Sequence, residues 1–177
     1  MDDGFWVFGY GSLMWAPEFP VAESVIAQAD GWRRSFCLRS IRHRGTEACP
    51  GLVLGLEPHP GRDCTGLALR VEDSLWPGVI AAIRARELVT EAYREALVPL
   101  ALADGRRVEA LAYVMRHDHW QYAGGLSGAE QARIIAAARG LRGPNADYLF
   151  NTVAHLDELG LPDPALTQLA AQVRGLI

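Results

Sequence analysis

The sequence predicts an α+β fold: a single domain over residues 1–177, with a mixed, barrel-like β-sheet and flanking helices. Runs with the composition and alternation of β-strands fill most of the first 115 residues, whereas the last third carries helical spacing. Strands followed by segregated helices are typical of this class. With 177 residues, half of them hydrophobic, the chain can bury one sizeable core but is too short for two ordinary domains.

Glycine, proline and charged residues separate the strand-like runs. We expect strands at residues 5–10, 24–40, 51–57 and 64–71. Asp104-Gly105 lies between the apolar runs 96–102 and 108–115, and an Asp-Gly pair in that position is a strong signal for a β-hairpin. A further pair of strands is therefore expected there.

Three helices are expected in the last third of the chain. Ser127 and Glu130 form a capping box that opens the first helix, which Gly140 is expected to close. Asn145 is expected to cap the second helix, and Asp163-Pro164 to start the third. The residues expected to face inward are Leu149, Val153 and Leu156 in the second helix, and Leu166, Leu169, Ala170 and Val173 in the third.

Charge and hydropathy exclude several classes of protein. A net charge of −4 argues against a nucleic-acid partner, although residues 33–44 are locally basic, and Arg33, Arg34 and Arg39 are expected on the solvated side of a strand. The apolar runs are broken by charge or glycine, so we expect neither a membrane span nor an export signal, and hence a cytoplasmic protein. The three cysteines (Cys37, Cys49 and Cys64) form no C-x-x-C pair, which favours reduced thiols.

The apolar run 5–8 breaks into a loop, Gly9-Tyr10-Gly11-Ser12-Leu13. Glycine permits backbone conformations closed to other residues and lets a ligand approach the main chain, so this loop could present N–H donors to a small anionic or carbonyl-bearing substrate. The alternative is a tight turn after a buried first strand. The glycines alone favour that alternative.

A further helix is expected between the strands, capped by Asp73 or Ser74 and with Pro77 in its first turn. The apolar stripe Trp76, Ile80, Ile83 has helical spacing, and Glu87 follows on the same face. A carboxylate on a core-facing stripe is paired or has a raised pKa, and a raised pKa suits general acid–base catalysis. The alternatives are an ion pair with Arg84 or Arg86, or a solvated Glu87 at a frayed helix end.

Four blocks of sequence together resemble the gamma-glutamylcyclotransferases, and within them the ChaC-like, glutathione-specific branch. The blocks are Trp6-Val7-Phe8-Gly9-Tyr10-Gly11-Ser12-Leu13-Met14-Trp15, then Ser40-Ile41-Arg42-His43-Arg44-Gly45-Thr46 with Pro50-Gly51, then Arg86-Glu87 with Tyr93-Arg94, and finally Gly143-Pro144-Asn145 with Tyr148-Leu149-Phe150. They follow the order of the family between residue 6 and about residue 150. Chance agreement over this length is not expected.

The resemblance implies that glutathione is cleaved to 5-oxoproline and cysteinylglycine without a metal or other cofactor. It implies that Glu87 is the general acid and base, and that the backbone N–H groups of Tyr10, Gly11, Ser12 and Leu13 bind the γ-glutamyl group. Tyr148 is expected to place a hydroxyl at the substrate. The run His117-Asp118-His119 is interpreted as a polar loop, because no third ligand has metal-site spacing.

Two departures from the family pattern bear on the substrate. Residues 88–92 replace a shorter, glycine-rich segment beside Glu87, and Leu52 replaces a common arginine that could hold the glycine carboxylate, a role for which Arg42 and Arg44 are candidates. Another γ-glutamyl peptide or amine therefore stays open as the substrate. The alternative from a different class is a non-catalytic γ-glutamyl-binding or regulatory protein, which would need no proton carrier at Glu87.

Overall fold

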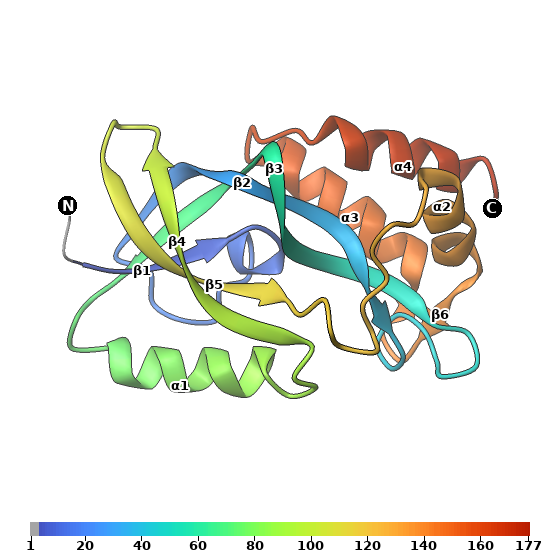
Figure 1. Cartoon of the computed structure of the whole chain (residues 1–177), viewed down its shortest axis with the longest axis horizontal. Helices are drawn as coiled ribbons and strands as arrows, with labels where there is room; N and C mark the ends of the chain where they lie inside the picture. The colour runs from blue at the N-terminus through green and yellow to red at the C-terminus, as the bar shows by residue number, and fades with distance from the viewer. Residues whose placement is uncertain (1–3) are drawn as a thin grey trace. The chain divides into compact units, whose positions relative to one another are not determined.

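A computed structural model describes residues 4–177, which form two compact units. The first unit comprises the chain up to Arg34 together with Leu56–Arg116, and the second comprises Ser35–Gly55 together with His117–Ile177. The described residues contain a closed five-stranded barrel and four α-helices, which confirms the predicted α+β class with a barrel-like sheet (Figure 1).

The barrel strands are β1 Phe5–Gly9, β2 Glu23–Ser40, β3 Gly51–Val71, β4 Tyr93–Leu102 and β5 Arg107–Met115. They are hydrogen-bonded in the order β1-β3-β2-β4-β5. β1 is antiparallel to β3, with Gly9 opposite Leu67, and parallel to β5, with Val7 opposite Leu111. The first strand is thus paired on both edges, and its pairing with β3 continues to Gly9, where the glycine loop begins.

The prediction of separate strands at 51–57 and 64–71 was wrong, because β3 runs through both. Residues 60–63 between them are exposed, so the hydrophobic pattern stops there although the backbone stays extended. Pro58 and Pro60 tolerate that extended backbone, and Gly61, with φ +79, takes a conformation that favours glycine. The predicted hairpin is confirmed: β4 pairs with β5 around Asp104 and Gly105, whose φ is +93.

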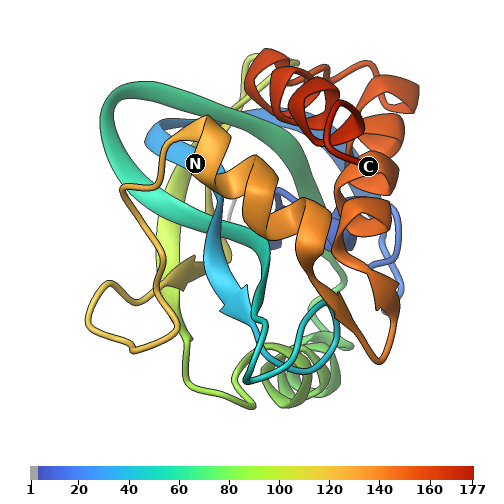
Figure 2. The same ribbon diagram turned by 90° about the vertical axis from the view of Figure 1, so that its right-hand side faces the viewer.

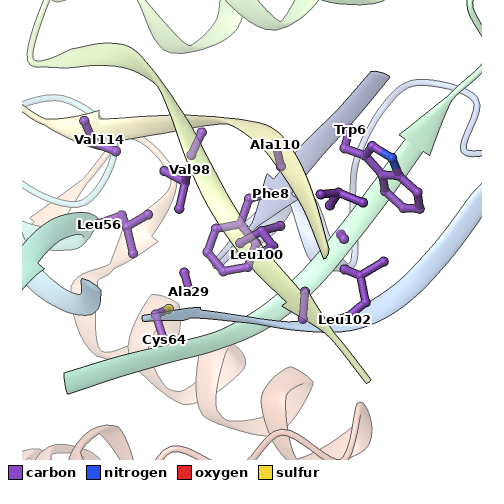
Figure 3. Close-up of a cluster of buried hydrophobic side chains, with 14 residues drawn as sticks. Trp6, Phe8, Ala29, Leu56, Cys64, Val98, Leu100, Leu102, Ala110 and Val114 are labelled. Atoms are coloured by element: carbon purple, nitrogen blue, oxygen red, sulfur yellow. The ribbon is translucent and has the colours of Figure 1, made fainter. Parts of the chain in front are cut away.

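The core of the first unit fills the inside of its strands (Figure 3). Alternate residues of each strand point inward, as the twofold period of a strand requires. Phe8 lies in the middle of this cluster in Figure 3. The cluster comprises Trp6, Phe8, Ala27, Ala29, Leu56, Cys64, Ala68, Val98, Leu100, Leu102, Val108, Ala110, Ala112 and Val114.

Arg33 and Arg34 do not simply line a solvated face, as the sequence had suggested. An Arg33 Nη lies 2.6 Å from Glu57 Oε1, and the Glu57 side chain is only 2% exposed. A buried carboxylate needs such a partner because desolvation of an unpaired charge is costly. Arg34 donates to two backbone carbonyls near the glycine loop, as described below.

The second unit contains α2 Gly128–Ala137, α3 Asn145–Glu158 and α4 Pro164–Arg174, which pack on one another (Figure 2), and two short paired strands, β6 Arg139–Gly140 and β7 Gly143–Pro144. The capping box of Ser127 and Glu130 and the Asp163 cap are confirmed. Gly140 does not close α2, which ends at Ala137 because the chain turns into β6. The predicted inward residues of α3 and α4 are all buried.

Asn145 is not the cap that its residue type predicted. Pro144 occupies the N-cap of α3, and the Asn145 side chain instead pairs with the backbone of Leu52: its Oδ1 accepts from the Leu52 N–H and its Nδ2 donates to the Leu52 carbonyl, both at 2.7 Å. Both partners are fully buried. The amide therefore satisfies two backbone groups that water cannot reach.

We expect Asn145→Ala to lower the free energy of unfolding by about 1–3 kcal/mol for each Leu52 group that it leaves unpaired. Asn151→Ala, on an exposed position of the same helix, is the matched control and should change stability little. Urea unfolding of the two variants measures the difference. Equal stabilities would show that the Asn145 pairing contributes nothing.

None of the three cysteines forms a disulfide with a described residue. Cys37 and Cys64 are buried, and Cys49 is exposed. Among the helices of residues 4–177, none has the length and apolar character needed to cross a bilayer.

Candidate active site

The glycine loop follows directly from β1. After Gly9 the chain bends at Tyr10 and Gly11 and enters a short 3-10 helix, η1, Ser12–Met14. The Gly11 carbonyl accepts from the Met14 N–H at 2.9 Å. The amides of Ser12 and Leu13 open η1, so no preceding helical turn supplies an acceptor for them. The loop therefore places the Ser12 and Leu13 amides at the start of a short 3-10 helix, and their use as donors to a substrate stays a prediction from the resemblance.

Two contacts hold the end of β1 against β3. A Cβ added at Gly66 would lie 2.3 Å from the Gly9 carbonyl oxygen and 2.9 Å from the Phe8 ring, so the two strands approach too closely for any side chain there. Arg34 Nη1 donates to the Tyr10 carbonyl at 2.6 Å, and Nη2 donates to the Thr65 carbonyl. No local sequence pattern predicts the Arg34 contacts, because they join residues far apart in the chain.

Helix α1, Trp76–Glu87, carries the predicted acid at its last position. The buried residues of α1 are Val79 and Ile83, so the predicted stripe is right for Ile83 and misses Val79, while Trp76, Ile80 and Glu87 are partly buried. The predicted cap at Asp73 or Ser74 was wrong. Leu75 is the N-cap and makes no side-chain capping bond, because a turn over residues 72–76 precedes the helix.

Only 19% of the Glu87 side chain is exposed, so the carboxylate is not solvated at a frayed helix end. Burial raises the pKa of Glu87; the Arg86 guanidinium, whose Nε lies 3.3 Å from Glu87 Oε1, lowers it, and the Glu18 carboxylate raises it. The negative end of the α1 dipole acts in the same direction as burial. Glu87 is thus a paired carboxylate that nevertheless binds a proton more readily than an ordinary glutamate.

Arg86 connects the end of α1 with the glycine loop. Its Nη2 donates to Ser12 Oγ at 2.7 Å, and its Nη1 donates to the Ala16 carbonyl at 3.1 Å. The same Nη1 lies 3.2 Å from Glu18 Oε2. The structure thereby brings the loop and the segment beside Glu87 together, as the resemblance implied. The Ser12 hydroxyl is used in this contact, while its amide remains at the start of η1.

A second set of contacts lies next to the site. Tyr10 donates through its hydroxyl to the Tyr113 carbonyl at 2.8 Å, and the Tyr113 hydroxyl donates to Glu95 Oε1 at 2.9 Å. Glu95 also accepts from Arg84 Nε and Nη2, at 2.6 and 3.0 Å. Burial, followed by the hydrogen bond to Glu95, raises the pKa of Tyr113, so its hydroxyl stays protonated. Arg84 is therefore engaged with Glu95, which decides the open question of which arginine accompanies Glu87.

Glu91 lies beyond the end of α1. It is exposed, with φ 56, and its carbonyl accepts from Arg116 Nη1 at 3.4 Å. It is therefore not one helical turn further along the face that carries Glu87.

Tyr148 and the candidate arginines belong to the second unit. The Tyr148 hydroxyl accepts from the Leu54 N–H at 3.5 Å, and its ring packs edge-on against Phe36. The Arg44 guanidinium lies 5.7 Å from the Tyr148 ring centroid and donates to the Pro144 carbonyl at 3.1 Å. The expected roles of Tyr148 and Arg44 in substrate binding stay predictions from the resemblance.

Residues of the run 117–119 contact neighbours a few positions along the chain, in agreement with a polar loop. The His117 ring stacks on Tyr122 with centroids 4.4 Å apart, and His119 Nδ1 accepts from the Gln121 N–H at 3.2 Å.

In the first unit, a glycine loop at the end of the first barrel strand is joined through Arg86 to a largely buried glutamate, which is the arrangement that the resemblance to the gamma-glutamylcyclotransferases implied. The ChaC-like protein family matches residues 5–176, and this chain belongs to that family. The match extends over both units.

Curated relatives agree with the family. The chain is 38% identical over 177 residues to the Escherichia coli protein named glutathione-specific gamma-glutamylcyclotransferase, covering 99% of this chain and 76% of the relative. It is 33% identical to gamma-glutamylcyclotransferase 2-3 of Arabidopsis thaliana, with 97% and 89% of the two chains covered. It is also 33% identical to human glutathione-specific gamma-glutamylcyclotransferase 1, with 95% and 76% covered.

Among solved structures, a yeast gamma-glutamyl cyclotransferase specific to glutathione superposes with a TM-score of 0.86. The superposition covers 97% of this chain and 96% of the yeast chain at 23% identity. This likeness confirms the fold.

Proposed function

We propose that the chain is a glutathione-specific gamma-glutamylcyclotransferase, which converts glutathione into 5-oxoproline and cysteinylglycine. The observation that carries the proposal is Glu87: a carboxylate with a raised pKa at the end of α1, joined through Arg86 to a loop of backbone donors. The names of the bacterial and human relatives support glutathione as the substrate.

In the proposed reaction the α-amine of the γ-glutamyl group attacks its own γ-carbonyl carbon. A carbon–nitrogen bond closes the five-membered lactam, and the bond to the cysteinyl nitrogen breaks. Glu87 takes a proton from the α-ammonium, since only the neutral amine has a lone pair for the attack, and then returns a proton to the departing nitrogen. The raised pKa fits both steps, because an effective acid–base group has a pKa near the working pH.

The loop contributes position and charge stabilisation. The amides of residues 10–13 are proposed to hold the γ-glutamyl group and to donate to the carbonyl oxygen as negative charge develops on it. Donor and acceptor already belong to one molecule, so the loop needs only to restrict rotation within the γ-glutamyl group and hold its amine and carbonyl in attack geometry. The reaction then needs no nucleophile from the enzyme and no water.

Incubation of the pure protein with glutathione, with γ-glutamyl dipeptides and with γ-glutamyl amines tests the substrate. We expect 5-oxoproline from glutathione at a far higher kcat/KM than from the other compounds. Turnover of another γ-glutamyl compound with glutathione untouched would overturn the glutathione specificity but keep the reaction class. No product from any of them would favour a binding protein.

A cytoplasmic location is part of the proposal. The substrate is itself the thiol that keeps cytosolic cysteines reduced, and the described cysteines form no disulfide. Fractionation of cells with an antibody to the protein tests this location.

A further inference from the structure

The Arg86 guanidinium contacts four groups that lie in two separate stretches of the chain. Three of them, Ser12 Oγ, the Ala16 carbonyl and Glu18 Oε2, lie in the segment 12–18 that contains η1. The fourth is Glu87 Oε1, at 3.3 Å from Arg86 Nε. The planar guanidinium of Arg86 thus contacts both the glycine loop, at Ser12, and the proposed acid–base group, Glu87.

Local hydrogen bonds shape the turn of this segment. The Trp15 and Ala16 amides both donate to the Ser12 carbonyl, which shapes the turn but does not set its distance from α1. Glu18 has φ 62, which is uncommon for a residue other than glycine and persists only where surrounding contacts hold it. The contacts that Arg86 makes with the Ala16 carbonyl and with the Glu18 carboxylate are placed to hold the backbone of Glu18 in this conformation.

We propose that Arg86 is a positioning residue of the cyclisation, which fixes the amides of the glycine loop relative to the Glu87 carboxylate. This inference rests on the proposed function. Arginine suits the task because its rigid guanidinium offers five donors in a fork, whereas lysine offers a single ammonium that cannot reach several acceptors with the same geometry.

The expected effect falls on kcat more than on KM. If the loop moves relative to Glu87, the γ-glutamyl group can still bind, but its amine and carbonyl no longer lie in attack geometry. A misplacement of about 1 Å can cost about 10²-fold in rate. We therefore expect Arg86→Gln to lower kcat by about 10²-fold at the pH of maximal activity, with a smaller change in KM.

The pH profile provides a readout that a purely structural role would not move. The charged groups that act on Glu87 are Arg86 on the same helix and Glu18 in the segment after η1, and Glu87 in turn raises the pKa of the Tyr113 hydroxyl on β5. Arg86 lowers the pKa of Glu87 and Glu18 raises it. As a base Glu87 must be deprotonated, so Arg86→Gln should move the acidic limb of kcat/KM to higher pH, and Glu18→Gln should move it to lower pH.

The experiment compares the wild type with Arg86→Gln, Arg86→Lys, Ser12→Ala and the double variant that combines Ser12→Ala with Arg86→Gln. Arg84→Gln is the matched control, since it removes an arginine from the same helix that contacts Glu95 instead of the loop. Arg86→Lys should restore the acidic limb but only part of kcat. Ser12→Ala should add little to Arg86→Gln, because both break the same hydrogen bond. Unchanged kcat and unchanged acidic limb in Arg86→Gln would overturn the inference.

Hydrogen exchange separates failure of this inference from failure of the proposed function. If the wild type releases no 5-oxoproline from any γ-glutamyl compound, the proposed function fails. The effect of Arg86 on the mobility of the glycine loop can still be measured. The Met14, Trp15 and Ala16 amides should then exchange faster in Arg86→Gln than in Arg84→Gln. Equal exchange in the two variants would show that Arg86 does not hold the loop.

Discussion

Glu87→Gln is expected to abolish measurable 5-oxoproline release while leaving the fold intact. Glutamine keeps the size of the side chain but cannot take the proton from the α-ammonium or return one to the leaving nitrogen. General acid–base groups contribute about 10²–10⁴-fold to rate, so the loss should be at least of that order. Removing a largely buried charge should not destabilise the protein, because burial already disfavours the ionised form of Glu87.

The matched control is Glu91→Gln, which removes a carboxylate four residues later in the chain, at an exposed position outside α1. We expect it to keep wild-type kcat. Circular dichroism and thermal unfolding of both variants separate a loss of chemistry from a loss of structure. Full activity in Glu87→Gln, with the fold intact, would remove Glu87 from the mechanism.

Gly66→Ala has the second largest expected effect, and it acts through the backbone. The new methyl group would lie 2.3 Å from the Gly9 carbonyl oxygen, so β1 must move away from β3 at the point where the glycine loop begins. Overpacking of this kind costs about 1–3 kcal/mol. We expect a lowered midpoint in urea together with a loss of kcat, because the displaced strand carries Tyr10–Leu13 with it.

Gly78→Ala is the control for this substitution. An added Cβ at Gly78, in α1, meets nothing within 4 Å, so the change should be neutral or stabilise the helix by up to about 1 kcal/mol. Gly66→Ala should therefore lower the stability of the protein, whereas Gly78→Ala should leave it unchanged or raise it. Wild-type stability and activity in Gly66→Ala would contradict the close approach of β1 and β3.

Local sequence signals predicted the elements that are stabilised locally. The hairpin at Asp104-Gly105 and the caps at Ser127 and Asp163 depend on residues within a few positions of one another, and all three are present. The position of Glu87 on the stripe of α1 was predictable for the same reason, since helical spacing is a short-range property.

The contacts that assemble the site were not predictable in this way. Arg34 reaches Tyr10 and Thr65, and Arg86 reaches Ser12, across 24 to 74 positions of sequence, and nothing in the local pattern separates them from solvated arginines. Asn145 has the residue type of a helix cap, yet tertiary contacts direct its side chain to Leu52. Long-range contacts of this kind override local preference, and functional sites concentrate them.

The most direct test of the central claim, that Glu87 and the glycine loop drive an intramolecular cyclisation, is product analysis after incubation with glutathione in ¹⁸O-labelled water. Attack by the substrate's own amine predicts unlabelled 5-oxoproline and cysteinylglycine in equal amounts. Glutamate carrying ¹⁸O in its γ-carboxylate would show that water attacks the carbonyl, and would contradict the mechanism.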